Sequence, residues 1–457
     1  MLKPLLLSEV CAALNGRVVG ADVAFAAVSS DSRKIETGQL FIALVGPNFD
    51  GHDYLTEVAA KGAVAALVQC EVPGAPLPQL VVADTRIALG QLGALNRAAF
   101  SQPLVAVTGS SGKTTVKELL ASILRTGLGG PVLATRGNLN NDLGAPLTLL
   151  ELASEHVGAV IELGANHVGE IAYTVALARP DVALINNAGL AHVGEFGGPE
   201  KIVAAKGEIL DGLGEQGIAV LNRDDPAFAV WRARAGARRV LSFALHDQLA
   251  DVYASELWRD ARGCAGFALA GSAGEVRIQL NLLGEHNVAN ALAAAAAAHA
   301  LGVSLASIKA GLEVLQPVKG RAAAELAANG VRVIDDSYNA NPLSMCAAVD
   351  ILAGFSGRTV LVLGDMGELG EWAEQGHRDV GSHAAGKVDA LYAVGPLMTH
   401  AVEAFGGNGR HFADQADLIE ALRRESGDTT ILIKGSRSAA MDKVVDALLQ
   451  RASGEVH

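Results

Sequence analysis

Residues 104–120 read LVAVTGSSGKTTVKELL: an apolar run typical of a strand, a loop bounded by glycines, and a stretch typical of a helix. Backbone N–H groups of such a loop can surround phosphate oxygens, the Lys113 ammonium adds positive charge, and the Thr114 hydroxyl can bind Mg²⁺. Val107 stands where the full phosphate-loop pattern has its first glycine, so this is the shorter G-x-x-G-K-T form. The alternative is an ordinary strand-to-helix turn, which would need neither the lysine nor the threonine. The residues predicted to bind ATP here are Gly109, Ser110, Ser111, Gly112, Lys113, Thr114 and Thr115.

Composition limits the partners of this site. The chain has 457 residues and a formal net charge of -13. A nucleic-acid partner needs a basic face, and none of the 36 Lys and Arg residues forms a run, so small anionic ligands are favoured instead. Widely spaced cysteines indicate reduced thiols, and they predict neither a disulfide framework nor a zinc site. These cysteines are Cys11, Cys70, Cys264 and Cys346.

The apolar segments predict a cytoplasmic protein without a membrane span. The opening MLKPLLLSEVCAALNG has only a three-leucine core before Ser8, which is too short for a signal peptide and predicts a helix capped at Ser8. The alanine-rich stretch 289–303 is shorter than the roughly 20 residues that cross a bilayer, and it predicts a buried helix. We also expect a monomer.

Three α/β units must position the functional groups, because a chain of this length exceeds what one hydrophobic core serves. Residues 1–82 predict a small N-terminal α/β substrate domain. Residues 83–315 repeat strand and helix, which indicates a parallel sheet covered by helices around the phosphate loop. Residues 316–457 repeat the pattern and predict a Rossmann-like α/β domain. Functional groups belong at the carboxyl ends of parallel strands, and the polar groups at these ends are the phosphate loop, Glu162, Asn186 and Asn222.

Further motifs accompany the phosphate loop. They are IELGANHVGEI (161–171), NNAGLAHVGEFG (186–197), IVAAKGEIL (202–210), GEHNVANALAA (284–294), VKGR (318–321), DDSYNANP (335–342), LGDMGELG (363–370) and KGSR (434–437). Together they resemble the Mur ligases, which build the peptide stem of bacterial cell-wall precursors. Matching segments run from residue 29 to residue 437, nearly the whole chain. The YNANP, LGDMGELG and TRGNLNND segments are most similar to the members that add D-alanyl-D-alanine to UDP-N-acetylmuramoyl-tripeptide.

The resemblance implies an ATP-dependent ligase. ATP would phosphorylate the terminal carboxylate of the UDP-muramoyl-tripeptide, and the amine of D-alanyl-D-alanine would then displace phosphate from the acyl phosphate. By resemblance Glu162 and His192 bind Mg²⁺ with Thr114, and Lys206 carries a carbamate that supports a second Mg²⁺. As single residues, His192 would be an ordinary loop histidine and Lys206 an exposed helix lysine. The catalytic residues so implied are Lys113, Glu162, His192 and Lys206.

Binding residues are implied in the same way. Asn287 and Asn290 lie one helical turn apart and would contact adenine, although Asn287 is also a candidate helix cap. From the third unit, Arg321, Asp336 and Tyr338 would reach over the nucleotide. For residues 29–33 the alternative is a capped turn. The residues implied at the UDP-substrate are Ser29, Ser30, Asp31, Ser32, Arg33, Asn138, Asn140 and Asn141, and those implied at the dipeptide are Ser436 and Arg437.

Two rival functions are left open by the motifs. One is another ligase of the same superfamily, such as a folylpolyglutamate synthase, whose acceptor is a single amino acid; the YNANP and SSDSR segments argue against it. The other is a P-loop ATPase switch, in which the strand after the loop usually ends in Asp, whereas VGAVIE ends in Glu162. The sequence does not choose between lysine and diaminopimelate at the third stem position.

Overall fold

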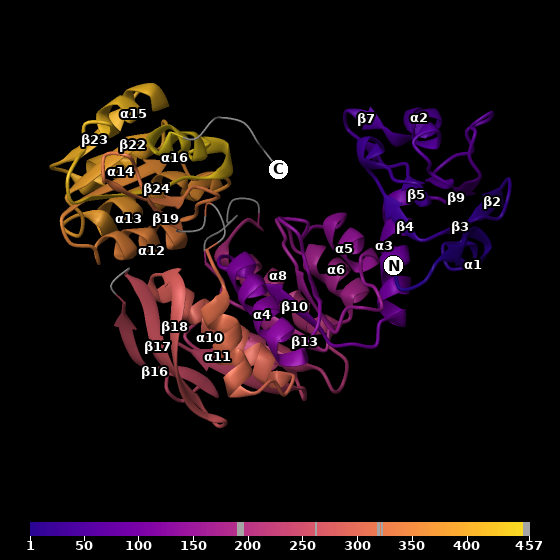
Figure 1. Cartoon of the computed structure of the whole chain (residues 1–457), viewed down its shortest axis with the longest axis horizontal. Coiled ribbons are helices and arrows are strands. Elements are labelled where there is room, and N and C mark those ends of the chain that lie inside the picture. Colours follow the sequence, from indigo (N-terminus) through magenta and orange to yellow (C-terminus); the bar gives the residue numbers. More distant parts are fainter. Residues whose placement is uncertain (190–195, 261–262, 318–319, 321–322, 451–457) are drawn as a thin grey trace.

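The computed structural model describes residues 1–189, 196–260, 263–317, 320 and 323–450. Within these residues the strands form three main sheets and two two-stranded ribbons. The central lobe lies between the N-terminal and C-terminal lobes (Figure 1). Each main sheet is mostly parallel and carries helices, so the expected α/β class with three parts is confirmed. Across the described residues, no helix is long and apolar enough to span a membrane.

The N-terminal lobe is built on a five-stranded sheet of order β2-β9-β8-β5-β4. Strand β2 is antiparallel to β9, and the other neighbours are parallel. The strands are β2 (Arg17–Val19), β4 (Ala27–Ser29), β5 (Gln39–Ile42), β8 (Ala65–Val68) and β9 (Gln79–Val81). Short elements surround this sheet: α1 (Leu7–Cys11), α2 (Leu55–Ala60), the 3₁₀ turns η1 (Ser32–Lys34) and η2 (Gly51–Tyr54), and the ribbons β1 (Leu5–Leu6) with β3 (Ala24–Phe25) and β6 (Val45–Gly46) with β7 (Phe49–Asp50).

The central lobe contains a nine-stranded sheet of order β11-β12-β10-β13-β14-β15-β16-β17-β18. Pairing is parallel as far as β16, and β16, β17 and β18 continue as an antiparallel meander. The parallel strands are β10 (Leu104–Thr108), β11 (Val132–Ala134), β12 (Gly158–Glu162), β13 (Val182–Ile185), β14 (Ile218–Asn222) and β15 (Arg239–Ala244). The meander strands are β16 (Val252–Arg259), β17 (Cys264–Gly271) and β18 (Gly274–Leu283).

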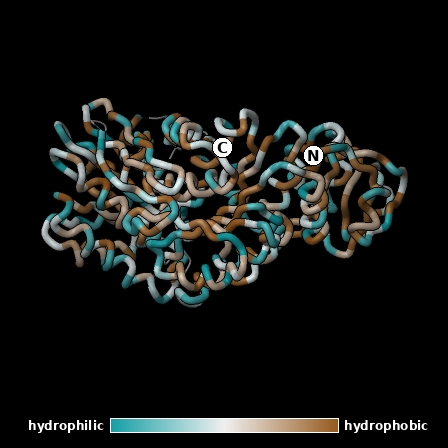
Figure 2. Tube along the Cα trace, turned by 90° about the horizontal axis from the view of Figure 1, so that it is seen from below, coloured by the Kyte–Doolittle hydropathy of each residue, from teal (hydrophilic) through white to brown (hydrophobic). Residues whose placement is uncertain are grey.

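Helices cover both faces of the central sheet. Alternate residues of β10 point to opposite faces: Val105 and Val107 contact one apolar cluster, and Leu104 and Ala106 contact the other. On the first face lie α4 (Lys113–Leu128), α10 (Glu285–Ala300) and α11 (Leu305–Val314). On the second lie α5 (Gly144–Leu150), α6 (Glu170–Ala178), α8 (Pro199–Gly207), η3 (Glu208–Gly212) and α9 (Phe228–Ala235), and α3 (Thr85–Ala99) packs on α5 and α6. Hydrophobic segments accordingly run through the lobes while hydrophilic segments lie mostly at their edges (Figure 2).

The C-terminal lobe has a six-stranded sheet of order β19-β20-β24-β21-β22-β23, in which only the β19–β20 pair is antiparallel among the described strands. Its strands are β19 (Ala323–Leu326), β20 (Arg332–Asp336), β21 (Arg358–Gly364), β22 (Ala390–Val394), β23 (Gly409–Phe412) and β24 (Thr429–Lys434). Its helices are α12 (Pro342–Leu352), η4 (Gly370–Trp372), α13 (Ala373–Ala384), α14 (Met398–Phe405), α15 (Gln415–Leu422), η5 (Arg437–Ala439) and α16 (Asp442–Leu449).

The C-terminal lobe packs on the central meander through α12. A Cβ added at Gly263, before β17, would lie 3.2 Å from the ring of Phe355, which follows α12. At Gly284, before α10, an added Cβ would lie 2.7 Å from Ile351. These glycines permit the close approach that joins the two lobes.

Two expectations about local structure have different outcomes. The alanine-rich stretch forms α10, which is buried along most of its length, as predicted. The helix cap at Ser8 is wrong, because α1 already begins at Leu7. The Ser8 hydroxyl instead donates to Asp22 Oδ2 over 2.6 Å, and its N–H donates to Asp22 Oδ1 over 2.9 Å. A distant carboxylate thus takes the role that a local cap would have had.

The crossing of α11 over α4 depends on Gly311. A Cβ at this position would overlap the backbone of Ile123 on α4, the helix that begins at the phosphate loop. We expect Gly311→Ala to lower the free energy of unfolding by about 1–3 kcal/mol through overpacking, measured as a lower thermal midpoint. Gly214→Ala is the matched control, because its Cβ would meet no atom within 4 Å. Equal midpoints for the two variants would refute this account of the crossing.

Candidate active site

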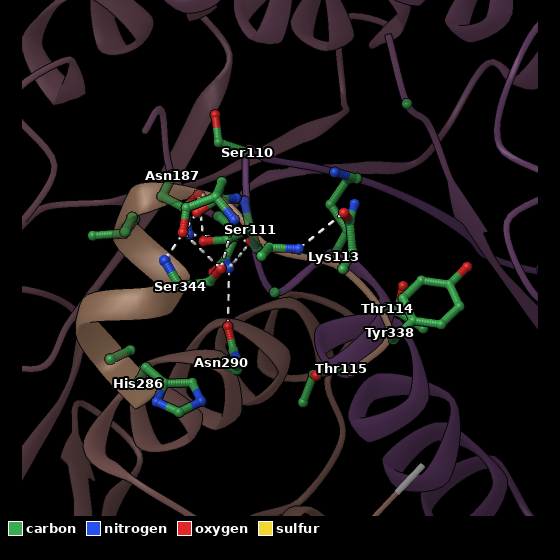
Figure 3. A pocket seen from close by; sticks show the side chains of 18 of the residues that line it. Ser110, Ser111, Lys113, Thr114, Thr115, Asn187, His286, Asn290, Tyr338 and Ser344 are labelled. Atoms are coloured by element: carbon green, nitrogen blue, oxygen red, sulfur yellow. Dashed lines mark hydrogen bonds between the residues drawn. The ribbon is translucent and has the colours of Figure 1, made fainter. Parts of the chain in front are cut away.

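A cleft of about 470 Å³ lies between the central and C-terminal lobes. The central lobe contributes the loop after β10, the ends of β12 and β14, and the first turn of α10. The C-terminal lobe contributes the loop after β20, the first turns of α12, and the loops after β21 and β24. Side chains from both lobes point into this cleft (Figure 3). The carboxyl ends of the parallel strands therefore meet here, as the sequence predicts.

The predicted phosphate loop connects β10 to α4. Gly112 caps the helix with φ +75°, and Lys113 is the first helical residue, so the N-terminal end of α4, which carries a positive partial charge, faces the cleft. Gly109 has φ +157°. The Lys113 Nζ donates to the Gly109 carbonyl over 2.8 Å, which folds the ammonium over the loop. All residues from Ser110 to Thr115 line the cleft.

Asparagines that follow β13 hold this loop in place. The Ser110 N–H donates to the Asn187 carbonyl over 3.0 Å, and the Ser111 N–H donates to Asn187 Oδ1 over 2.9 Å. The Asn186 amide donates to the Ser111 carbonyl and to Asn290 Oδ1, each over 2.9 Å. A Cβ at Gly112 would overlap this amide pair, which explains why glycine stands there.

Glu162 ends β12 and is 2% exposed. Its Oε2 accepts from the Thr114 hydroxyl over 3.1 Å, and its Oε1 accepts from the Asn140 amide over 2.8 Å. A carboxylate and a hydroxyl beside a phosphate loop form a hard oxygen set that fits Mg²⁺. Among the described residues there is no group of three or more His, Cys, Asp or Glu side chains placed to hold a metal.

Lys206 lies on α8 and is buried, which contradicts the ordinary expectation of an exposed helix lysine. Burial and the nearby Lys113 charge lower the pKa of its ammonium to about 7, although Glu170, Glu208 and Glu162 act in the opposite direction. Its Nζ lies 5.3 Å from the centre of the Phe196 ring. At neutral pH a large share of this amine is therefore uncharged.

The first turns of α10 form another wall of the cleft. The Asn290 amide donates to Asn287 Oδ1 over 3.0 Å, and the Asn287 amide donates to the Leu283 carbonyl over 2.8 Å. Gly284, not Asn287, is the N-cap of α10, so the capping interpretation of Asn287 is wrong. His286, to which the sequence motifs assigned no role, points into the cleft from the same turn (Figure 3).

The C-terminal lobe supplies charged groups to the opposite wall. Asp336 Oδ2 accepts from the buried Lys434 ammonium over 2.6 Å, and this ammonium also donates to the Asn339 carbonyl over 3.0 Å. Tyr338 and Arg437 line the cleft. Ser436 is buried, and its hydroxyl donates to the Asp365 carbonyl over 2.5 Å.

A second helix N-terminus faces the same cleft. Asn341 caps α12 by accepting from the Ser344 N–H over 2.9 Å, and Pro342 is the first helical residue. Leu343 reaches the central lobe, because a Cβ at Gly189 would lie 3.1 Å from it. The positive ends of α4 and α12 thus border one space.

The residues expected at the UDP-substrate fall into two places. Asn138 and Asn140 line the cleft. Asn141 does not line it; its Oδ1 accepts from the Gly144 N–H over 2.8 Å at the start of α5. The other expected residues, Ser29, Ser30, Asp31, Ser32 and Arg33, lie in the N-terminal lobe at the end of β4 and in η1, away from this cleft. There Asp31 caps η1 and accepts from the exposed Arg33 side chain over 2.8 Å.

Two predicted site residues, His192 and Arg321, lie outside the described residues. Conversely, sequence reasoning gave no site role to several cleft residues. A signal existed for them, because they stand inside the motifs already noted. These additional cleft residues are Asn187, His286, Asn339, Glu368 and Lys434.

Protein-family models match three parts of the chain. The Mur ligase family, catalytic domain, matches residues 24–97. The Mur ligase middle domain matches residues 107–298. The Mur ligase, glutamate ligase domain, matches residues 320–437.

Individual relatives match over almost the entire length. The UDP-N-acetylmuramoyl-tripeptide--D-alanyl-D-alanine ligase of Escherichia coli K12 is 46% identical over 451 residues, which cover 98% of this chain and 99% of the relative. A crystal structure of MurF from Acinetobacter baumannii superposes with a TM-score of 0.93 at 41% identity, covering 98% and 99% of the two chains. The MurF ligase of Thermotoga maritima in complex with ADP has a TM-score of 0.83 at 27% identity, covering 93% and 97%.

The glycine at 112 allows a sharp test of the phosphate loop. We expect Gly112→Ala to raise the KM for ATP at least about tenfold, because the new Cβ displaces the Asn186 and Asn290 amides and disturbs donors to phosphate. Gly129→Ala is the matched control. It introduces the same left-handed strain at the other end of α4 (φ +71°) but meets no atom within 4 Å. Similar KM values for the two variants would contradict the predicted role of the loop.

Proposed function

The chain belongs to the Mur ligase family, and we propose how its residues join D-alanyl-D-alanine to UDP-N-acetylmuramoyl-tripeptide at the expense of ATP. The reaction forms ADP, phosphate and a new peptide bond in peptidoglycan synthesis. One observation supports the residue assignment: the phosphate loop of the central lobe and Asp336, Lys434 and Arg437 of the C-terminal lobe line the same cleft.

The triphosphate is assigned to the phosphate loop at the N-terminus of α4. Loop N–H groups and the helix end would hold the phosphate oxygens, and the Lys113 ammonium would exchange the Gly109 carbonyl for a phosphate oxygen. Asn287 and Asn290 would contact adenine, and Asp336 and Tyr338 would approach the nucleoside from the other wall. We assign Arg321 to phosphate from the family resemblance.

Magnesium is assigned to Thr114 and Glu162, whose oxygens lie 3.1 Å apart beside the loop. His192 is added on resemblance alone. When bound, the metal would supply positive charge that lowers repulsion between the triphosphate and a carboxylate. We propose two such ions, with the second held by a carbamate on Lys206.

The chemistry proceeds in two steps. A carboxylate oxygen of the tripeptide attacks the γ-phosphorus of ATP, the bond to the β,γ-bridging oxygen breaks, and ADP leaves. The dipeptide amine then attacks the carbonyl carbon of the acyl phosphate; phosphate leaves with the bonding electrons, and the nitrogen loses a proton. The protein mainly positions the reactants and neutralises charge, for which Lys113 is suited. Arg437 and Ser436 would hold the dipeptide carboxylate.

The UDP-substrate is assigned to a path between two lobes. The diphosphate or uracil would lie at Ser29–Arg33, and the peptide would reach the cleft past Asn138 and Asn140. Arg86 of α3 contacts Asp142 over 2.6 Å, which links the loop of these asparagines to the helix leading from the N-terminal lobe. We assign the three functions to residues 1–82 for the UDP-substrate, 83–315 for ATP and 316–457 for the dipeptide.

The surroundings of Lys206 support the carbamate. CO₂ reacts with the neutral amine, and an ordinary lysine with a pKa near 10.4 is almost wholly protonated at pH 7. The pKa of Lys206 is lowered to about 7, so the neutral form is abundant there. The product is an anion that lies near the carboxylates of Glu162, Glu170 and Glu208. Bound cations would offset the repulsion among these negative charges.

We further propose that the enzyme is cytoplasmic and monomeric. ATP is a cytoplasmic substrate. Both walls of the cleft come from one chain, so no second copy is needed to complete it.

An acceptor screen tests the function. With ATP and UDP-N-acetylmuramoyl-tripeptide held constant, we expect D-alanyl-D-alanine to start ADP release, while D-alanine, L-lysine or L-glutamate leave it at background. Omitting the UDP-substrate should also abolish release, which a coupled ADP assay measures. Equal ADP release without any acceptor would favour the ATPase switch, and product formation with a single amino acid would favour the other ligase class.

Formation of the Lys206 carbamate should decrease as the pH falls. Its amine is neutral above a pKa of about 7 and protonated below it, so CO₂ uptake should fall about fivefold between pH 7 and pH 6 and level off above pH 8. The measurement is ¹³C NMR of enzyme incubated with ¹³C-bicarbonate. Lys206→Ala should lose the signal and the activity. Lys201→Ala, which removes an exposed lysine of the same helix, should keep both. Wild-type enzyme that is active without the signal would disprove the carbamate.

A further inference from the structure

Another buried lysine stands on α4, the helix that begins at the phosphate loop, and has no part in the chemistry described so far. Lys117 stands one helical turn after Lys113 on α4, and it is only 1% exposed. Its ammonium donates to the Thr135 carbonyl over 2.5 Å and lies 2.9 Å from Glu118 Oε1. A buried ammonium loses hydration, which a methionine of similar length would not, so packing alone does not account for a lysine here.

Thr135 connects this ammonium to the proposed metal ligand. It follows β11 and is itself 1% exposed. Its N–H donates to the Val160 carbonyl over 3.1 Å, and its Oγ1 accepts from the Glu162 N–H over 2.9 Å. Lys117 therefore holds the carbonyl of the residue whose hydroxyl fixes the backbone of Glu162.

The same residue precedes the loop that carries the cleft asparagines. Asn140 lies five residues after Thr135, and its amide donates to Glu162 Oε1 over 2.8 Å. The Gly164 N–H returns a bond to the Asn140 carbonyl over 2.8 Å. Hydrogen bonds thus run from Lys117 through Thr135 to the backbone of Glu162, and the Glu162 carboxylate is held by Asn140 from the loop that follows Thr135.

We propose that Lys117 is a positioning residue, which fixes Thr135 and through it sets Glu162 to receive Mg²⁺ next to Thr114. The inference rests on the proposed function, since it assumes that Glu162 binds the metal with nucleotide. Lys117 itself does not line the cleft. Partners of metal ligands typically change metal affinity about 10- to 100-fold when removed, because they orient the ligand.

The test is calorimetric titration of the full-length enzyme with ADP over a series of Mg²⁺ concentrations. We expect Lys117→Met to raise the Mg²⁺ concentration giving half-maximal ADP affinity about tenfold, while ADP affinity without Mg²⁺ stays within about twofold. The KM for D-alanyl-D-alanine should not change, because that substrate is assigned to the other lobe. A shift of all three quantities together would mean a general loss of structure and would overturn the proposal.

A second pair of variants keeps the test decisive if Lys117→Met does not fold. Thr135→Val removes the hydroxyl that accepts from Glu162 and leaves the carbonyl that accepts from Lys117. It should reproduce the Mg²⁺ shift, whereas Thr135→Ser, which keeps the hydroxyl, should resemble the wild type. An unchanged Mg²⁺ requirement in folded Thr135→Val would also overturn the proposal. ADP binding is read without ligation, so an enzyme that binds Mg²⁺ and ADP as described but joins no dipeptide would refute the proposed function separately.

Discussion

The side-chain amide of Asn186 is the junction on which the cleft depends. It joins the Ser111 carbonyl of the phosphate loop to Asn290 on α10, so the loop and the first turns of α10 cannot move independently. When polar groups are fixed before the substrate arrives, no free energy is spent on ordering them during the reaction. The requirement for glycine at 112 follows from the same junction, since the space that a Cβ would need is already filled by the two amides. A loop rich in glycine and serine is thereby made rigid by its neighbours.

The phosphate loop and the repeated strands and helices around it could be predicted from the sequence, because short local segments encode them. The glycines, Lys113 and Thr114 stand within one short segment, and the strand preceding them is continuously apolar because both its faces are covered. Where a residue's environment is set by elements distant in sequence, the pattern was not sufficient. Ser8 illustrates this, because Asp22 arrives from another segment to bind it. The antiparallel meander of β16, β17 and β18 departs from the parallel sheet expected for residues 83–315, although the two-residue connection between Gly271 and Gly274 is a hairpin signal.

Burial of charged residues was the least predictable property of the site. As a single residue, Lys206 was expected to be an exposed helix lysine, but it is buried, because helical spacing alone does not say how wide the covered face is. Asn140 and Asn141 are adjacent and chemically identical, yet one donates to Glu162 and the other accepts from the N–H of Gly144, the first residue of α5. Their backbone directions decide the difference, and these depend on the tertiary position of the loop. The catalytic roles of such residues stay predictions, while their positions are now defined.

The paired starts of α4 and α12 bear on how an acidic protein captures anions. Far from the surface, a net charge of -13 repels both nucleotide and UDP-linked peptide. Within the cleft, two helix dipoles direct their positive ends at one space, and they act over about the length of a helical turn. Added salt screens the distant repulsion more than these short-range fields. Encounter rates with anionic ligands should therefore rise with moderate ionic strength, opposite to the behaviour of proteins that attract their ligands by overall charge.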